Sequence, residues 1–595
     1  MDYFVKNSLR NFRHQLYQMK KYLFVSTLLV FSFSCKYVAK KETGALSANP
    51  FSYTIQKKII CSNGAVVSAH PLASMVGAAV LKQGGNAFDA AIATQLALAV
   101  VYPGAGNIGG GGFMVARTSN GENIAIDYRE KAPGKASRDM YLDSAGNPLL
   151  DKSQNGHLAA GVPGTVAGLF AAMPYAKLPF KQLIQPAIEL AQNGFAVTEA
   201  EAADLNSIQE DLKALNTQPN AFQRQTAWKA GDTLLQKDLA LTLTRIRDEG
   251  KKGFYEGETA RLIVEEMKRA NGIISSEDLK NYEAAKRNPV VFNYKDYQII
   301  AMPLPSSGGI ILQQCLKMIE DKNIGGLGFH SAAAIQLMIE AERRSYADRA
   351  EYMGDADFVK VPVKKLTGDA YAKERMKDYI PGKAGSSRQT KAGVIGKESE
   401  ETTHLSIVDK WGNMVAVTTT LNGGYGSRTV VGGAGFLLNN EMDDFSVKPG
   451  VPNMYGALGT EANAIQPGKR MLSSMTPTLL LKNNQPFMVV GTPGGTTIPT
   501  SVFQSILNVA EFGLNAEDAV YKPKFHHQWM PDVVYVEKDF PGPVIDSLKA
   551  MGYTIEQRGQ IGRTELIRIY KGNKDSTYRF EAIADKRGDD DAEGY

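Results

Sequence analysis

Cysteine is scarce in this sequence, with only Cys35, Cys61 and Cys315 among 595 residues. Three widely spaced cysteines do not make the disulfide framework that holds small secreted domains together. No CxxC or HExxH spacing occurs, and the histidines are scattered apart from His526-His527, which reads as a structural pair. We therefore expect neither a metal site nor another cofactor.

A concentrated block of positive charge is also missing. The net charge is +5, and no cluster of Lys and Arg is interleaved with aromatic residues. A nucleic-acid partner is therefore not expected. With 43% hydrophobic and 22% charged residues, the composition is that of a soluble globular protein. A chain of this length predicts two large segments, which can interleave.

No apolar run near the N-terminus is long enough to span a bilayer. Tyr22–Phe33 is about a dozen residues and follows Lys20-Lys21, as in a secretory signal. The following Ser34-Cys35 completes a layout that resembles a bacterial lipoprotein signal, although Ser32 stands where a larger aliphatic residue is usual. We expect residues 1–34 to be a signal peptide, Cys35 to be lipidated and residues 35–55 to be a polar linker. Export to the periplasm or cell envelope follows, with a plainly cleaved signal as the alternative.

The glycine-rich loop from Gly104 to Gly112 contains the spacing GxGxxG. A dinucleotide-binding fingerprint needs the order strand, loop, helix. Here a predicted helix at 87–101 precedes the loop and a predicted strand at 113–116 follows it. We therefore interpret the glycines as allowing close passage beside other backbone.

Hydrophobic periodicity predicts an alternation of helices and strands in the rest of the chain. Strands are expected at 64–69, 122–130, 402–408, 414–420, 435–438, 478–481 and 487–490. Helices are expected at 71–81, 310–319, 333–349 and 499–512, and the region 200–290 reads as largely helical.

Thr402 lies where a polar, charged run gives way to alternating strands. One interpretation is that it begins an ordinary edge strand. The other is that the chain is cut before Thr402, so that its hydroxyl becomes a nucleophile and its new α-amino group the base. If Val408 pairs with Met414, Thr402 lies opposite Thr420, within reach of a hydrogen bond between the hydroxyls. The five-residue loop does not fix that register.

Four other sites can be interpreted from the local sequence. Arg129 lies at the end of a predicted strand. It either forms a surface ion pair or points into a cleft, where its guanidinium group could bind a carboxylate through two hydrogen bonds. The glycines after Pro493 precede a helix, so their N–H groups could bind an oxyanion. Ser473-Ser474 alone reads as a turn, and Asp443-Asp444 as a solvated loop.

From about Ile59 to its C-terminus, the sequence resembles the γ-glutamyltranspeptidases of the N-terminal-nucleophile hydrolase superfamily. The resemblance is carried by many motifs in order. They are His70-Pro71-Leu72-Ala73, Lys82-Gln83-Gly84-Gly85-Asn86-Ala87, Asn107-Ile108-Gly109-Gly110-Gly111-Gly112-Phe113, Asp127-Tyr128-Arg129-Glu130, Pro305-Ser306-Ser307-Gly308-Gly309, Tyr346-Ala347-Asp348-Arg349, Thr402-Thr403-His404, Leu437-Leu438-Asn439-Asn440-Glu441-Met442-Asp443-Asp444-Phe445-Ser446, Leu472-Ser473-Ser474-Met475 and Pro493-Gly494-Gly495. Met471 departs from the family pattern, which usually has Pro there.

The resemblance implies an α+β fold, a four-layer αββα sandwich built from two autoprocessed subunits. The large subunit would be 56–401 and the small one 402–595. Thr402 would be the nucleophile and Thr420 would orient it, with the N–H groups of Gly494 and Gly495 as the oxyanion hole. The remaining implied roles are donor carboxylate binding by Arg129, Ser473 and Ser474, donor ammonium binding by Asn422, Glu441 and Asp444, and gating by Tyr455 in a lid at 449–460.

The activity implied is that of a γ-glutamyltranspeptidase and glutathione hydrolase. A γ-glutamyl-Thr402 ester would pass its acyl group to water or to an amino acid or dipeptide acceptor. The alternative within the same fold is a cephalosporin or glutaryl acylase, but such enzymes need no ammonium site, and Glu441 and Asp444 are both present. A non-enzymatic surface lipoprotein is the third hypothesis, disfavoured by the presence of Thr402 and Thr420.

Overall fold

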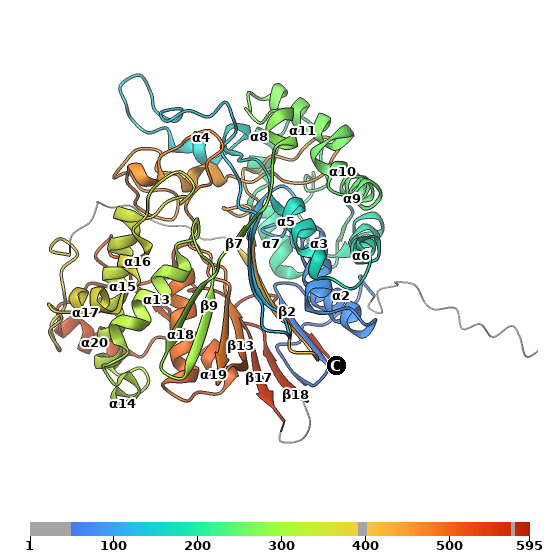
Figure 1. The fold of residues 1–595 in the computed structure, drawn as a ribbon. Helices are drawn as coiled ribbons and strands as arrows, with labels where there is room; N and C mark the ends of the chain where they lie inside the picture. Colours follow the sequence, from blue (N-terminus) through green and yellow to red (C-terminus); the bar gives the residue numbers. More distant parts are fainter. Residues whose placement is uncertain (1–48, 391–401, 573–576) are drawn as a thin grey trace, which may run out of the picture. The chain divides into compact units, whose positions relative to one another are not determined.

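Two seven-stranded antiparallel sheets form the middle layers of the computed structural model, which describes residues 49–390, 402–572 and 577–595 (Figure 1). The first sheet has the order β1 (Lys58–Cys61), β18 (Tyr578–Ile583), β17 (Glu565–Lys571), β13 (Gln485–Gly491), β12 (Thr478–Lys482), β9 (Tyr297–Ala301) and β8 (Val290–Tyr294). The second has the order β19 (Asp591–Gly594), β2 (Gly64–Ser68), β10 (Thr403–Asp409), β11 (Met414–Thr420), β3 (Gly111–Arg117), β4 (Asn123–Asp127) and β7 (Ala285–Arg287).

Each sheet combines strands from before and after residue 402. In the second sheet, β10 and β11 lie between β2 on one side and β3 on the other. In the first, β17 and β18 lie between β1 and β13. The two parts of the chain therefore share both sheets, as the sequence predicts for two entwined subunits.

Apolar side chains fill the space between the sheets. Val67 and Phe113 from the second sheet belong to the same buried cluster as Leu479, Val489 and Ile567 from the first. Strands of this kind are buried on both faces, because helices cover the outer face of each sheet. The cluster therefore forms the hydrophobic core between the two sheets.

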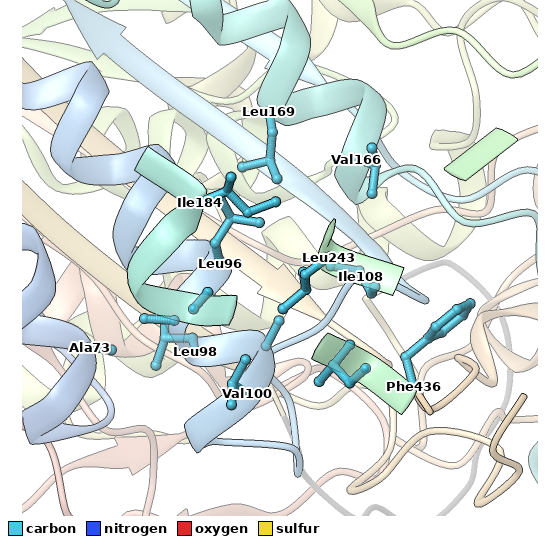
Figure 2. Close-up of a cluster of buried hydrophobic side chains, with 14 of the residues drawn as sticks. Ala73, Leu96, Leu98, Val100, Ile108, Val166, Leu169, Ile184, Leu243 and Phe436 are labelled. Carbon is cyan, nitrogen blue, oxygen red and sulfur yellow. The ribbon is translucent and has the colours of Figure 1, made fainter. Parts of the chain in front are cut away.

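Helices cover the outer face of each sheet. On the second sheet lie α2 (Pro71–Lys82), α3 (Ala87–Val101) and α5 (Thr165–Ala172), while α6 (Phe180–Asn193) packs against α3 and α9 (Lys237–Glu249) against α6. Figure 2 shows part of this core, where Leu96 of α3 lies near Ile184 of α6. On the first sheet lie α13 (Gly308–Ile319), α18 (Thr497–Ala510) and α19 (Ala516–Tyr521), while α15 (Ala332–Tyr352) packs against α13 and α20 (Gly542–Ala550) against α15. The expected αββα sandwich is confirmed, with its two helical layers on opposite sides of the sheets in Figure 1.

The remaining elements are short or peripheral. They are α4 (Leu150–Gln154), α7 (Glu199–Ser207), α8 (Gln209–Leu215), α10 (Lys252–Tyr255), α11 (Gly257–Arg269), α12 (Ser276–Lys280), α14 (Ile324–Leu327), α16 (Val363–Leu366), α17 (Asp369–Arg375), β5 (Phe195–Ala196), β6 (Thr233–Leu234), β14 (Phe525–His526), β15 (Val534–Val536) and β16 (Ile555–Gln557). Among the described residues, no helix has both the length and the apolar character needed to cross a bilayer. Cys61 and Cys315 are both buried free thiols, and Cys35 lies outside the described residues.

The predicted register of the central hairpin is confirmed. Val408 pairs with Met414, and the ladder continues to Thr403 opposite Thr419. The strand begins at Thr403, one residue later than expected. The strand expected at 435–438 is wrong, because Gly435 adopts a left-handed turn (φ 78°) and only Leu437 forms an isolated bridge, to Val430. The region 200–290 is mainly helical but also contains β6 and β7.

The glycine-rich loop passes against other backbone, as the sequence predicts. A Cβ atom on Gly109 would lie 2.1 Å from the carbonyl oxygen of Leu437, and one on Gly110 would lie 2.1 Å from that of Thr420. The order is α3, loop, β3, which excludes the dinucleotide-binding geometry. Asp127, at the position of a ribose-binding acid, is buried and forms ion pairs with Arg287 and Arg470. The glycines therefore allow the loop to pack behind the end of β11.

Replacing Gly110 with alanine should destabilise the protein, because the added methyl group would overlap the Thr420 carbonyl. Overpacking of this kind costs about 1–3 kcal/mol, and it should appear as a lower melting temperature. Gly542→Ala is the matched control, since nothing lies within 4 Å of a Cβ there. Equal melting of the two variants would contradict this account of the loop.

Candidate active site

Thr402 lies at the start of β10, with only 5% of its surface exposed. Continuing the β10–β11 register by one residue places it opposite Thr420. Both threonines line a small cavity with eight of the other residues predicted from the sequence, namely Arg129, Asn422, Glu441, Asp444, Tyr455, Ser473, Ser474 and Gly495. Gly494 lines a second, larger cavity, which also reaches Thr402. The structure thus brings all the predicted site residues together around Thr402, apart from Cys35.

The end of β11 is fixed by Asn107 of the glycine-rich loop. Its Nδ2 donates to the Thr420 carbonyl (2.8 Å) and to Thr419 Oγ1 (3.2 Å), and its Oδ1 accepts from the N–H of Gly110 (3.0 Å). On the other side, Thr420 Oγ1 accepts a hydrogen bond from the N–H of Asn422 (2.8 Å). The hydroxyl of Thr420 is therefore held beside Thr402 by the loop behind it and the turn after it.

Gly494 and Gly495 precede α18 in a backbone conformation that favours glycine, with φ values of 131° and 52°. A Cβ on Gly495 would lie 2.7 Å from the ring of Tyr455, and one on Gly494 would lie 2.4 Å from Thr497 Oγ1. Within the described part of the chain, neither N–H donates to an acceptor, although the Gly494 carbonyl accepts from Thr497. Two N–H donors beside a nucleophile are the arrangement expected of an oxyanion hole.

Arg129 is a buried cation between two acids. Its guanidinium contacts Glu441 through Nη1 and Asp444 through Nη2, and 1% of its surface is exposed. It also donates to the carbonyls of Met471 and Leu472, both at 3.4 Å. The surface interpretation of Arg129 is therefore wrong, as is the solvated-loop interpretation of Asp443-Asp444, because Asp443 is also fully buried.

Burial sets the protonation of this cluster. Loss of water raises the pKa of Glu441 and of Asp444, and the charge of Arg129 opposes the rise in both. The pKa of the neighbouring Glu130 is likewise raised by burial, to about 8. Among the described residues, Glu441 Oε2 has no hydrogen-bond partner. The cluster therefore has a buried carboxylate oxygen for which a cationic group is the natural partner.

Sequence reasoning missed Arg349 and Asn453, which are among the polar residues that line this cavity. Arg349, near the end of α15, lines the cavity and donates through Nε to Ser307 Oγ (3.1 Å). Its charge lowers the pKa of Asp444, against the larger effect of burial. Asn453 donates to Asp444 Oδ1 (2.8 Å). Arg349 belongs to a motif shared with the resembled family, which was the available signal, whereas Asn453 in the lid segment gave none.

The segment 449–460 covers the cavity. Tyr455 donates its hydroxyl to the Asn422 carbonyl, and the N–H of Met454 donates to Asp443 Oδ2 (2.7 Å). With these contacts in place the cavity holds only about 20 Å³, roughly the space of one water molecule. The segment therefore leaves little free space over the charged residues.

A histidine base is not part of this arrangement. None of the described residues that line the two cavities is a histidine. His404 is buried in β10, where its ring contacts Thr418 Oγ1 (2.9 Å) and Ser406 Oγ (3.1 Å). Burial lowers its pKa to about 3. Proton transfer at Thr402 must therefore use another group.

Comparison with known proteins gives consistent matches over most of the chain. A family model described as gamma-glutamyltranspeptidase matches residues 73–595. The glutathione hydrolase proenzyme of Escherichia coli strain K12 is 46% identical over 530 residues, covering 88% of this chain and 91% of that protein. The Acylase ACY 1 proenzyme of Pseudomonas sp. strain V22 is 36% identical, covering 84% and 89%. The solved structure of cephalosporin acylase from Bacillus halodurans has a TM-score of 0.78 at 26% identity, covering 92% and 98%.

The pKa of His404 predicts an acid-dependent loss of stability. Between pH 6.5 and about 3 the unfolded chain binds a proton at this residue and the folded protein does not, so stability falls as the pH falls through that window. At pH 5 this amounts to about 2 kcal/mol. The difference in melting temperature between pH 7 and pH 5 should therefore be smaller in His404→Gln than in the wild type. Ser406→Ala keeps the imidazole and should retain the wild-type difference; an unchanged difference in His404→Gln would contradict the assignment.

Proposed function

The chain belongs to the gamma-glutamyltranspeptidase family, and on that premise we propose that it cleaves itself before Thr402 and then transfers γ-glutamyl groups through that residue. The substrates would be glutathione and other γ-glutamyl amides. The observation that carries the proposal is the convergence of Thr402 with a glycine pair and a buried Arg129–Glu441–Asp444 cluster around one cavity. Thr402 would supply the nucleophile, and the cluster would recognise the donor.

The acyl transfer needs a base that is neutral near pH 7. The α-amino group freed at Thr402 would titrate at about 7.7–8, so it can accept the proton of Oγ. Oγ then attacks the γ-carbonyl carbon, and the N–H groups of Gly494 and Gly495 stabilise the negative oxygen. One such donor is worth about 2.7–4 kcal/mol of barrier. The C–N bond breaks and the departing amine takes the proton, leaving a γ-glutamyl ester on Thr402 for water or an amine to attack.

The charges around the cavity match the zwitterionic end of a γ-glutamyl donor. Arg129, with Ser473 and Ser474, would bind its α-carboxylate. Glu441 and Asp444, with the side chain of Asn422, would bind its α-ammonium. In the closed cavity these opposite charges contact one another, so a donor carrying both charges can replace each contact with an equivalent one. Tyr455 would shield the reacting centre from solvent.

A glutaryl acylase of the same fold is the alternative activity. A glutaryl group has a terminal carboxylate for Arg129 but no ammonium, so it would draw Arg129 away from Glu441 and Asp444 and supply no cation in its place. Burying carboxylates without such a partner is unfavourable. The acids in the cavity therefore favour a γ-glutamyl donor.

Processing and export complete the proposal. Cleavage before Thr402 would give a large subunit, 56–401, which keeps the linker 35–55 in front of it once the signal peptide 1–34 is removed, and a small subunit, 402–595. The two would remain associated because each contributes strands to both sheets. Export to the periplasm or cell envelope, with a lipid on Cys35, would follow from the N-terminal pattern. The mass of the first mature residue distinguishes a lipidated Cys35 from a plain cut.

Thr402→Ala should remain a single inactive precursor, because it lacks the hydroxyl needed both for self-cleavage and for acyl transfer. The wild type should give two fragments on a denaturing gel, and N-terminal sequencing of the smaller should begin at Thr402. Thr420→Ala, which keeps the nucleophile, should be cut more slowly than the wild type. Active wild-type protein that runs as one intact band would contradict the mechanism, as would normal cleavage of Thr402→Ala.

Arg129→Ala and Arg129→Lys should raise the KM for γ-glutamyl-p-nitroanilide by at least about tenfold, because a charged hydrogen bond is worth about 1.5–3 kcal/mol. The lysine variant keeps the charge beside Glu441 and Asp444 but cannot form a bidentate contact with the donor carboxylate. Its precursor should still be cleaved. Arg138→Lys is the control, since Arg138 forms a partly exposed ion pair with Glu461 away from the cavity. An unchanged donor KM in both Arg129 variants would disprove the carboxylate assignment.

A further inference from the structure

A buried glutamine connects the lid segment 449–460 to the oxyanion loop, residues 493–496, which carries the glycine pair. Gln528 follows β14 and has 4% of its surface exposed. It lines a small cavity that shares Ala457 and Thr496 with the cavity around Arg129. The acyl-transfer mechanism described so far does not use this side chain, although it lies next to the reacting centre.

The two ends of the Gln528 amide have different partners. Its Oε1 accepts from the Thr496 hydroxyl (2.7 Å). Its Nε2 donates to the carbonyl of Gly456 in the lid segment and to the carbonyl of Met530, both at 3.4 Å. The orientation of the amide follows from these partners, because a carbonyl oxygen can only accept. Gln528 therefore bridges the lid segment and the oxyanion loop.

His526 holds the same amide oxygen from another side. Its Nε2 lies 2.8 Å from Gln528 Oε1, and its Nδ1 lies 2.8 Å from Thr500 Oγ1 in α18. Burial lowers the pKa of His526 to about 3, so the ring is neutral at pH 7 and carries one proton. Since an amide oxygen only accepts, that proton is on Nε2, and Nδ1 accepts from the Thr500 hydroxyl. The imidazole thus fixes the position of the Gln528 amide.

The backbone next to Gln528 is anchored as well. The indole Nε1 of Trp529 donates to the carbonyls of Ser387 (3.1 Å) and Thr390 (3.0 Å). Trp529 has a left-handed backbone conformation, with φ at 69°, which persists in a non-glycine residue only where the surrounding contacts hold it. A rigid segment therefore presents the Gln528 side chain.

Thr496 is the residue through which Gln528 can act on the reaction. It directly follows Gly494 and Gly495 and forms the N-terminal cap position of α18. Its carbonyl accepts from the Tyr346 hydroxyl, and its own hydroxyl donates to Gln528. Glycine has more backbone freedom than any other residue, so the direction of the two glycine N–H groups depends on what holds the neighbouring residues in place.

We propose that Gln528 is a positioning residue that ties the lid segment to Thr496 and thereby orients the N–H groups of the oxyanion loop. The inference rests on the proposed γ-glutamyl transfer at Thr402. Donors of this kind accelerate a reaction because they point at the developing charge before it forms. Loss of the Gln528 amide would leave both N–H groups in place but less well directed.

Single-turnover release of p-nitroaniline from γ-glutamyl-p-nitroanilide, with cleaved enzyme in excess, tests the proposal. The maximum rate reports acylation, and the enzyme concentration at half the maximum reports donor binding. Gln528→Met has a similar volume but lacks the amide, and it should lower the maximum rate about tenfold, less than the ~10²–10³-fold cost of losing a whole oxyanion donor. The half-maximal concentration should change by less than about twofold, since Gln528 is not among the described residues that line the Arg129 cavity.

Gln336→Met is the matched control. Gln336 is buried in α15, and its Nε2 also donates to two carbonyls, those of Ile380 (3.0 Å) and Lys383 (2.9 Å). It lines none of the cavities that contain Thr402 or Gln528 among the described residues. This variant should lower the melting temperature without slowing the single turnover.

Thr496→Val removes the same hydrogen bond from the other partner and should also slow acylation. Thr496→Ser keeps the hydroxyl and should be faster than Thr496→Val. In the double variant Thr496→Val/Gln528→Met the rate should fall by much less than the product of the two single effects, because both substitutions remove one interaction.

Hydrogen exchange tests the link to the lid segment. Amides within 449–460 should exchange faster in Gln528→Met than in the wild type, because the Gly456 carbonyl loses its hydrogen bond to the glutamine. Gln336→Met should leave exchange in this segment unchanged. Equal exchange in Gln528→Met and the wild type would contradict the link.

The role of Gln528 in catalysis would be overturned by an unchanged maximum rate in Gln528→Met, or by single effects that simply multiply in the double variant. A change in donor binding with an unchanged maximum rate would also overturn it. If Gln528→Met does not fold or is not cleaved, Thr496→Val and Thr496→Ser decide by the same rate. Failure of the wild type to release p-nitroaniline would instead contradict the proposed function itself.

Discussion

The pairing of β10 with β11 is the constraint on which the candidate site depends. The register from Val408–Met414 to Thr403–Thr419 determines which residue of β11 faces Thr402. A shift of one residue would place the neighbouring side chain, which points to the other face of the sheet, in that position. The loop through Asn107 and Gly110 fixes the same strand end from behind. Strand pairing and loop packing thus set the position of the two hydroxyls before any substrate is bound.

Charge balance is the second constraint. Arg129 and Glu441 are buried and Asp444 is only partly exposed, and each charge would be unfavourable in that place without the others. A bound zwitterion would keep the total charge of the cavity unchanged while exchanging internal ion pairs for contacts with the ligand. Such a site selects against groups that carry one charge only. Specificity then comes from the cost of leaving a buried partner without its opposite charge.

Local patterns in the sequence were sufficient for much of the fold. The hairpin register assumed from the strand pattern is the observed one, and the close approach of the glycine loop, expected from the absence of a Cβ, is confirmed. The strand expected at 435–438 failed because the left-handed turn at Gly435 overrides its apolar pattern.

The site was harder to predict from local patterns. Arg129 alone reads as a surface residue, and only tertiary packing places it between Glu441 and Asp444, more than 300 positions away in the chain. Asn453 was missed for the same reason, since its contact with Asp444 depends on how the lid folds back. Family resemblance supplied what residue spacing could not.

Because strands from before and after residue 402 share each sheet, refolding depends on whether the chain is still continuous. A continuous chain can form both sheets by an intramolecular reaction, whereas two separate fragments would first have to meet and then interleave seven strands in each sheet. A protein that is cut after folding and later unfolds can therefore no longer refold by the intramolecular reaction. Its working lifetime would be set by the rate of unfolding and not by an equilibrium between folded and unfolded states. If the chain is cut before Thr402, the topology that holds the fragments together would also make their separation effectively irreversible.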